Sequence, residues 1–138
     1  MSFFERLKGK TIRSVLGLKK HSKEVVITVE GNQELVMNHF QCCYESVLVS
    51  QIDGDINDII GETVTMAEES IVTGSDGPDY HWTATFYKLA TRKGYLTFTW
   101  NGQSNGYYSE RVDLEWRKTK VQTKFAPTLG DLKWPSLN

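Results

Sequence analysis

The stretch Trp82-Thr-Ala-Thr-Phe-Tyr-Lys-Leu-Ala-Thr-Arg-Lys-Gly-Tyr-Leu-Thr-Phe-Thr-Trp100 decides the fold class. Its side chains alternate with a period of two on both sides of Arg92-Lys-Gly94, which is the pattern of two β-strands. In the second half, Leu96, Phe98 and Trp100 fall on one face. Because Arg92-Lys-Gly94 is typical of a tight turn, the stretch predicts an antiparallel hairpin.

Shorter patterns of the same kind extend the prediction in both directions. Further strands are expected over residues 11–18, 24–30, 34–38, 45–52, 63–72 and 107–116. Asn101–Gly106 is expected to turn the chain between the last two strands, and Thr73–Asp79 reads as a long loop. Asp55 is expected to cap a helix. The prediction is therefore a mainly β protein, an antiparallel meander or sheet with one short helix near residues 55–60.

The length of 138 residues fits a single domain. We expect the antiparallel domain to span residues 1–116 and a basic C-terminal extension to span residues 117–138. No apolar run approaches the ~20 residues that cross a membrane. The start MSFFERLKGK has no long apolar stretch with a small-residue cleavage site, so we expect no signal peptide and a cytoplasmic location. The two cysteines, Cys42 and Cys43, are expected to be free thiols.

Charge is distributed unevenly along the chain. The net charge is −1, but residues 1–24 carry +5, residues 25–87 carry −11 without any Lys or Arg, and residues 88–138 carry +5. One interpretation is that the basic ends pair with the acidic middle across a sheet. The other is that the protein has an acidic face for a basic partner and a basic face for phosphates.

Several motifs together resemble a known family. They are Cys42-Cys-Tyr-Glu-Ser-Val47, the segment 54–61, Met66-Ala-Glu-Glu69, Thr85-Phe-Tyr-Lys-Leu-Ala-Thr91 and Trp100-Asn-Gly-Gln-Ser-Asn-Gly-Tyr-Tyr-Ser109. In this order they resemble small phage or prophage proteins known only as a domain of unknown function, over about residues 9 to 115. The resemblance implies a phage origin, hence the host cytoplasm, and no activity.

Two constellations have the composition of metal sites. His39-Phe-Gln-Cys-Cys-Tyr-Glu45 offers an imidazole, two thiols and a carboxylate, but strand alternation would place Cys42 and Cys43 on opposite faces. The segment 53–58 has the spaced carboxylates of a calcium loop, but Asp58 stands where that loop needs glycine and Val64 where it needs a bidentate glutamate. We therefore expect no cofactor and no metal.

A third constellation has the parts of a nucleotide site. The candidate ligand-binding residues are Ser104, Asn105, Gly106, Tyr107, Tyr108 and Arg111. Backbone N–H groups at the glycine and asparagines could converge on an anion, the tyrosines offer stacking faces, and Arg111 could bind phosphate. Asn-Gly pairs are also ordinary hairpin chemistry, so a plain turn is the alternative. No P-loop or dinucleotide fingerprint occurs.

These observations favour a binding protein over an enzyme. The first hypothesis is a phage-encoded, non-enzymatic protein that sequesters a nucleotide-derived host defence signal. The second is an inhibitor whose acidic face binds a basic host defence protein, and a small hydrolase is the least favoured. DNA is not an expected partner, because the sequence pI is near 6.3 and no basic helix is predicted. Exposed strand edges favour a homo-oligomer.

Overall fold

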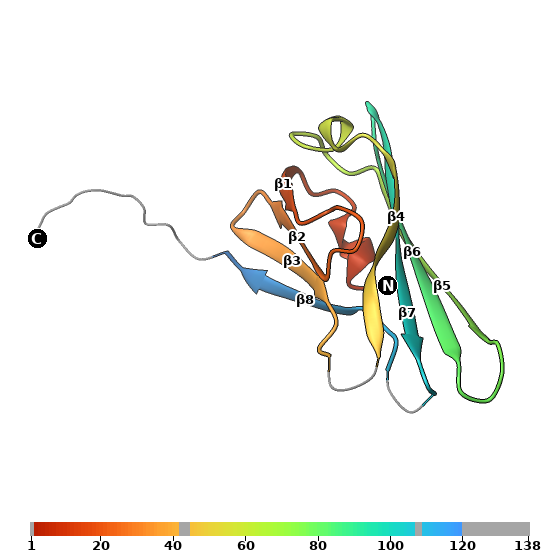
Figure 1. The fold of residues 1–138 in the computed structure, drawn as a ribbon. Helices are drawn as coiled ribbons and strands as arrows, with labels where there is room; N and C mark the ends of the chain where they lie inside the picture. The colour runs from red at the N-terminus through yellow and green to blue at the C-terminus, as the bar shows by residue number, and fades with distance from the viewer. Residues whose placement is uncertain (1, 42–44, 107–108, 120–138) are drawn as a thin grey trace, which may run out of the picture.

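Two four-stranded antiparallel sheets face each other in the computed structural model, which describes residues 2–41, 45–106 and 109–119 (Figure 1). The small sheet has the order β1-β2-β3-β8 and the large sheet β4-β7-β6-β5. The elements are η1 (Phe4–Leu7), β1 (Ile12–Leu16), β2 (Glu24–Val29), β3 (Gln33–Asn38), β4 (Ser46–Gly54), η2 (Ile56–Asp58), β5 (Met66–Ser75), β6 (His81–Thr91), β7 (Gly94–Ser104) and β8 (Asp113–Lys118). The prediction of a mainly antiparallel β fold is confirmed.

The predicted hairpin forms the centre of the large sheet. β6 and β7 pair from His81↔Ser104 to Thr91↔Gly94, and β5 adds to the other side of β6. β5 continues through Ser75, so the first part of the expected loop at Thr73–Asp79 is strand. The period of two holds: alternate residues of β6 are buried, and the buried face of β7 includes the three apolar residues predicted from the sequence.

The last strand does not pair with β7, which corrects the expected third hairpin. β7 runs through Asn101–Ser104, where a turn was predicted, and β8 crosses to the small sheet to pair with β3, from Gln33↔Lys118 to Asn38↔Asp113. Gly102 is in the strand because another backbone passes close to it: a Cβ there would meet the carbonyl oxygen of Glu110 at 2.2 Å. β8 also includes Arg117 and Lys118, and residues 120–138 of the expected extension lie outside the described residues.

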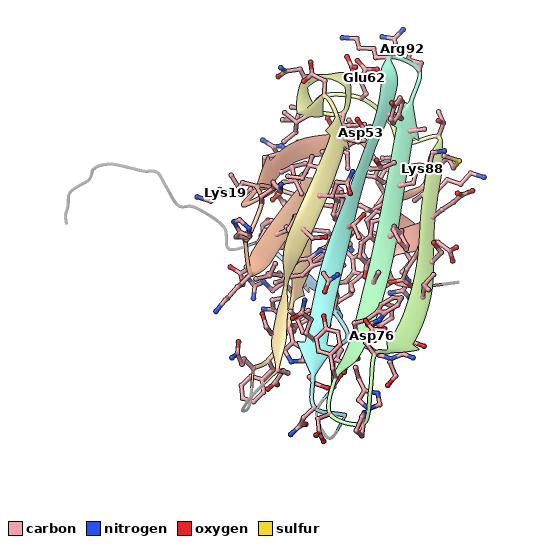
Figure 2. The ribbon with its side chains drawn as sticks, turned by 45° about the vertical axis from the view of Figure 1, so that its right-hand side comes forward. Lys19, Asp53, Glu62, Asp76, Lys88 and Arg92 are labelled. Atoms are coloured by element: carbon pink, nitrogen blue, oxygen red, sulfur yellow. The ribbon has the colours of Figure 1, made fainter. Side chains whose placement is uncertain are left out.

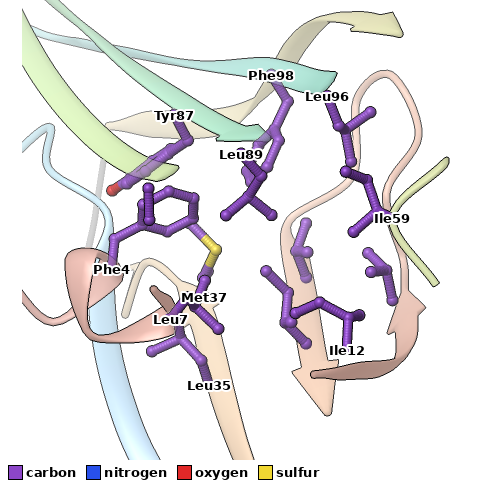
Figure 3. Packing of buried hydrophobic residues seen from close by; sticks show 14 of the residues in the cluster. Phe4, Leu7, Ile12, Leu35, Met37, Ile59, Tyr87, Leu89, Leu96 and Phe98 are labelled. Atoms are coloured by element: carbon purple, nitrogen blue, oxygen red, sulfur yellow. The ribbon is translucent and has the colours of Figure 1, made fainter. Parts of the chain in front are cut away.

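The core lies between the sheets and is closed by the N-terminal 3-10 turn η1 (Figure 3). Phe4 and Leu7 of η1 are fully buried. The Phe4 ring lies 4.6 Å from the Tyr87 ring, which stacks on Phe98 at 5.4 Å, measured between centroids. The sequence did not predict η1, although it provides two of the core side chains.

The expected helix near residues 55–60 is a single 3-10 turn, η2. The carboxylate of Asp55 caps it by accepting a hydrogen bond from the backbone N–H of Asn57 (2.9 Å), as predicted. Two backbone hydrogen bonds between residues 21–22 and Val49 join the small sheet to β4. No helix in the described ranges is long and apolar enough to cross a membrane.

Acidic residues of the middle segment pair with cations from the chain ends, as the first charge interpretation expects. The Arg117 guanidinium contacts the Glu34 carboxylate at 2.6 Å across β3 and β8. Arg92 and Lys93 contact Glu62 at 2.9 Å and 3.4 Å, and a hydrogen bond from Arg92 is the main reason that the pKa of Glu62 is lowered. Asp53 and Glu62 lie toward one end of the large sheet and Asp76 toward the other (Figure 2).

Candidate functional site

A basic hollow of about 510 Å³ lies where the N-terminal segment meets the edge of the small sheet. We call it the basic hollow; it is lined by Glu5, Arg6, Lys8, Lys10, Gln33 and Trp116. The lining therefore contains three cationic side chains and one carboxylate, that of Glu5. The carboxylate of Glu5 already accepts a hydrogen bond from the backbone N–H of Ser2 (2.8 Å). The hollow has the net positive charge and the size of a site for an anionic small molecule.

The indole of Trp116 is held in a fixed orientation at this hollow. Its ring N–H donates a hydrogen bond to the carbonyl oxygen of Phe3 (2.8 Å), across 113 positions of sequence. The Lys10 ammonium group lies over the ring, 5.7 Å from its centroid. Arg6 likewise lies 5.2 Å from the centroid of the Phe3 ring. An ordered aromatic ring and positive charge therefore occur together, which is what recognition of a base linked to phosphate requires.

Sequence reasoning missed the basic hollow because its parts come from opposite ends of the chain. The cations lie in η1 and just after it, while Trp116 is in β8. They meet because β8 pairs with β3 instead of β7. The available signal was the positive charge of both ends. Charge alone could not indicate that the ends are neighbours in space.

Two of the predicted site residues are brought together by the structure around a carboxylate of the chain itself. The Glu110 carboxylate accepts hydrogen bonds from the hydroxyl groups of Thr83 (2.9 Å) and Ser104. The backbone N–H of Gly106 donates to the Ser104 hydroxyl (2.9 Å). The hydroxyl and N–H groups expected to bind an external anion are thus engaged within the protein. Thr83 and Ser104 are both buried. We call the group of Thr83, Ser104, Gly106 and Glu110, joined by these hydrogen bonds, the Glu110 knot.

The remaining predicted residues do not join that group. The Arg111 side chain borders a different hollow, together with Glu69 and Tyr87, whereas Gly106 lines one with His81 and Trp82. Asn105 is half-buried beside Gly106. Tyr107 and Tyr108 lie outside the described residues. Among the described residues, Gly106 and Arg111 therefore line two different hollows.

The region considered for zinc contains a buried histidine and glutamate in direct contact. The Nε2 atom of His39 lies 2.9 Å from a carboxylate oxygen of Glu45, and Nδ1 lies 2.8 Å from the backbone carbonyl oxygen of Arg111. A carbonyl oxygen only accepts, so His39 donates from Nδ1 in the contact with Arg111. The pair anchors the segment after β3 to the segment before β8. No group of three metal-binding side chains occurs among the described residues, and Cys42 and Cys43 lie outside them.

Comparison with known proteins identifies a family but no activity. No curated protein and no solved structure matches this chain. The family model named Domain of unknown function (DUF7448) matches residues 5–114, which include most of both sheets and the cations of the basic hollow. It confirms the predicted resemblance to a domain of unknown function, and the chain therefore belongs to the DUF7448 family.

Proposed function

We propose that the protein is a non-enzymatic binding protein that holds a phosphate-bearing, nucleotide-derived ligand in the basic hollow. The observation that carries this proposal is the meeting of three cations, Arg6, Lys8 and Lys10, with the oriented indole of Trp116. Cations balance phosphate charge, and an indole face stacks on a nucleobase for about 1–3 kcal/mol. Gln33 at the rim can donate and accept hydrogen bonds, as base recognition needs.

The size and order of the hollow also support this ligand class. A volume of about 510 Å³ is within the range of roughly 300–1,000 Å³ typical of small-molecule sites. The hydrogen bond to Phe3 fixes the indole before a ligand arrives, which reduces the ordering cost of binding. The predicted site at Ser104–Arg111 is the competing location. We favour the basic hollow because the Ser104 hydroxyl and Gly106 N–H are already engaged in the Glu110 knot.

The biological setting is part of the same proposal. A phage-encoded member of this family would act in the host cytoplasm by sequestering a nucleotide-derived defence signal, which requires tight binding and no chemical step. The acidic-face inhibitor is less well supported. Asp53 and Asp76 are at opposite ends of the large sheet (Figure 2), and Glu62 is paired with Arg92 and Lys93.

The test is a calorimetric titration of ATP, NAD and a cyclic dinucleotide into the wild-type protein and variants. For the ligand that binds, Lys10→Gln should lower the affinity by roughly 5-fold, the worth of one exposed charge contact of about 1 kcal/mol. Trp116→Leu should lower it by roughly 5- to 150-fold through lost stacking. Each variant's melting temperature shows whether it is folded.

Two control variants locate the site. Lys88→Gln removes one positive charge from the exposed face of the large sheet and should leave the affinity unchanged. Arg111→Ala removes one charge from the predicted loop and should also have little effect. A large loss with Arg111→Ala and none with Lys10→Gln would place the ligand at Ser104–Arg111 instead. No binding of any of the three ligands would contradict the proposal and favour the acidic-face inhibitor.

A further inference from the structure

We propose that two copies of the protein pair through strand β5, so that their two large sheets join into one continuous antiparallel sheet. β5 is the outermost strand of the large sheet, and β6 lies on one side of it (Figure 2). On its other side, β5 exchanges no backbone hydrogen bond with any residue in the described ranges. Such an edge can accept one more strand. The proposal concerns assembly and is independent of the ligand proposed for the basic hollow.

The register of β5 and β6 shows which backbone groups of β5 point to this free edge. At the end of the hairpin, the N–H of Asp76 donates to the carbonyl oxygen of Tyr80 (3.0 Å), which continues the register Ser75↔His81. In an antiparallel pair, every second residue directs both its N–H and its C=O to the partner strand. Even-numbered residues of β5 therefore bond to β6. Odd-numbered residues, Ile71 among them, direct both groups to the free edge.

The second half of β5 has the composition of a strand that pairs rather than of a protected edge. Residues 70–75 include no charged side chain and no proline. Ile71 and Val72 are 40% and 49% exposed, and alternation places them on opposite faces of the sheet. β-Branched residues favour strand pairing, whereas charged side chains and proline oppose it. A second strand at this edge would cover apolar surface on both faces.

The other described edges of the two sheets are occupied or charged. β4, at the opposite edge of the large sheet, exchanges two backbone hydrogen bonds with residues 21–22 through Val49, and β1 bonds to residues 61–62 through Ile12. β8 has charged side chains at four of its six positions, Asp113, Glu115, Arg117 and Lys118. Since β5 alone among the described edges lacks such protection, pairing through it ends at two copies, as in a closed two-fold dimer.

One register makes β5 complementary to a second copy of itself. A two-fold axis at Ile71 places this residue opposite the partner's Ile71. Glu69 then lies opposite the partner's Thr73, whose hydroxyl can donate to the carboxylate, and no acid lies directly opposite an acid. An axis at Glu69 would instead oppose two like charges. With the axis at Ile71, the odd-numbered residues 69–73 of both copies can exchange about six backbone hydrogen bonds.

Sedimentation equilibrium of the full-length protein, over a wide range of micromolar concentrations, measures the assembly. We expect a dimer mass at the upper end and dissociation to a monomer on dilution, because one strand pair is a small interface. A monomer mass at every concentration overturns the proposal, whichever other segment or partner covers β5.

Two substitutions of Ile71 test the edge. Ile71→Pro removes an N–H that points to the free edge and keeps every hydrogen bond to β6, so the protein should stay folded and dimerise at least about 10-fold more weakly. Ile71→Lys should weaken the dimer as much without altering the backbone, because like charges would meet at the axis. Glu115→Lys, on the exposed side of β8, is the control and should leave the dimer unchanged. An unchanged dimer in either folded Ile71 variant overturns the proposal.

Cross-linking tests the register in a chain whose own cysteines, Cys42 and Cys43, are replaced by serine. The Cα atoms of a hydrogen-bonded antiparallel pair lie about 5.5 Å apart, which a disulfide can span. Under mild oxidation, Ile71→Cys should therefore give a covalent dimer. Thr73→Cys should not, because the two introduced thiols would be four residues out of register, roughly 14 Å apart. No cross-link at position 71, or equal cross-linking at both positions, overturns the proposed pairing.

Discussion

Replacing Glu110 with alanine should destabilise the protein, because this carboxylate holds the segment before β8 against the large sheet. It accepts hydrogen bonds from the hydroxyl groups of Thr83 and Ser104, which are 4% and 6% exposed. A hydrogen bond to a charged group contributes about 1.5–3 kcal/mol. Since Glu110 is only half-buried, we take the lower end for each bond. The free energy of unfolding should therefore fall by about 3 kcal/mol, a large part of the 5–15 kcal/mol typical of a domain.

Urea denaturation measures this change, provided that two probes of unfolding coincide. Glu110→Gln keeps the shape and one acceptor, so its loss should be about half that of Glu110→Ala. Glu30→Ala is the matched control, because its side chain is exposed at a turn, and it should change stability by no more than about 0.5 kcal/mol.

A double-mutant cycle with Ser104→Ala separates the hydrogen bond from other effects of truncation. The two changes should be non-additive by about 1–3 kcal/mol, since both remove the same bond. A loss for Glu110→Ala no larger than that of Glu30→Ala, or additive changes in the cycle, would refute the Glu110 knot. The Ser104 hydroxyl would then be free for a ligand, as the sequence prediction requires.

Three further predictions concern packing, pH and assembly. Gly74→Ala should lower stability by about 1–3 kcal/mol, although alanine is normally better in a strand, because its Cβ would lie 2.3 Å from the Trp82 indole; increased stability in urea would contradict this. The lowered pKa of Glu62 implies stability that is present above the ordinary pKa of 4.5 and lost as pH falls through the folded value. In Arg92→Gln the melting temperature should therefore lie below that of wild type above the ordinary pKa, and the difference should shrink as pH falls through the folded value; superimposable curves would rule this out. Edge strands β5 and β8 contain no proline, so light scattering should give at least a dimer mass, against which a monomer mass would count.

Much of the fold could be predicted because alternation is a local property. The period of two identified β6 and β7 and the buried apolar face of β7, and Asp55 was correctly predicted to cap the turn η2. The partner of β8 could not be predicted, since alternation shows which face a strand buries and not which strand lies beside it. The turn at Asn101–Gly106 was wrong in part for a related reason. Gly102 lets the Glu110 backbone approach closely. An Asn-Gly pair in the sequence predicts a turn and does not indicate such a contact.

The candidate sites could be predicted less well than the strands. The basic hollow combines Lys10 with Trp116, and the hollow beside Arg111 combines that residue with Glu69, so each depends on long-range pairing. Arg111, a predicted site residue, is exposed and borders a hollow. Its neighbours in that hollow come from β5 and β6 rather than from its own loop. The sequence predicted a ligand site made of adjacent positions, whereas the hollows in the structure are lined by residues far apart in the sequence.

Binding of a nucleotide-derived ligand at the basic hollow can be tested by a ¹H–¹⁵N NMR titration with the nucleotide that binds by calorimetry. The indole N–H of Trp116 gives a separate signal, so binding can be followed at the ring proposed to stack on the base. We expect this signal and the backbone signals of Lys10 and Gln33 to shift together and saturate with the ligand. Unchanged signals at these residues, with shifts confined to Ser104–Arg111, would contradict it.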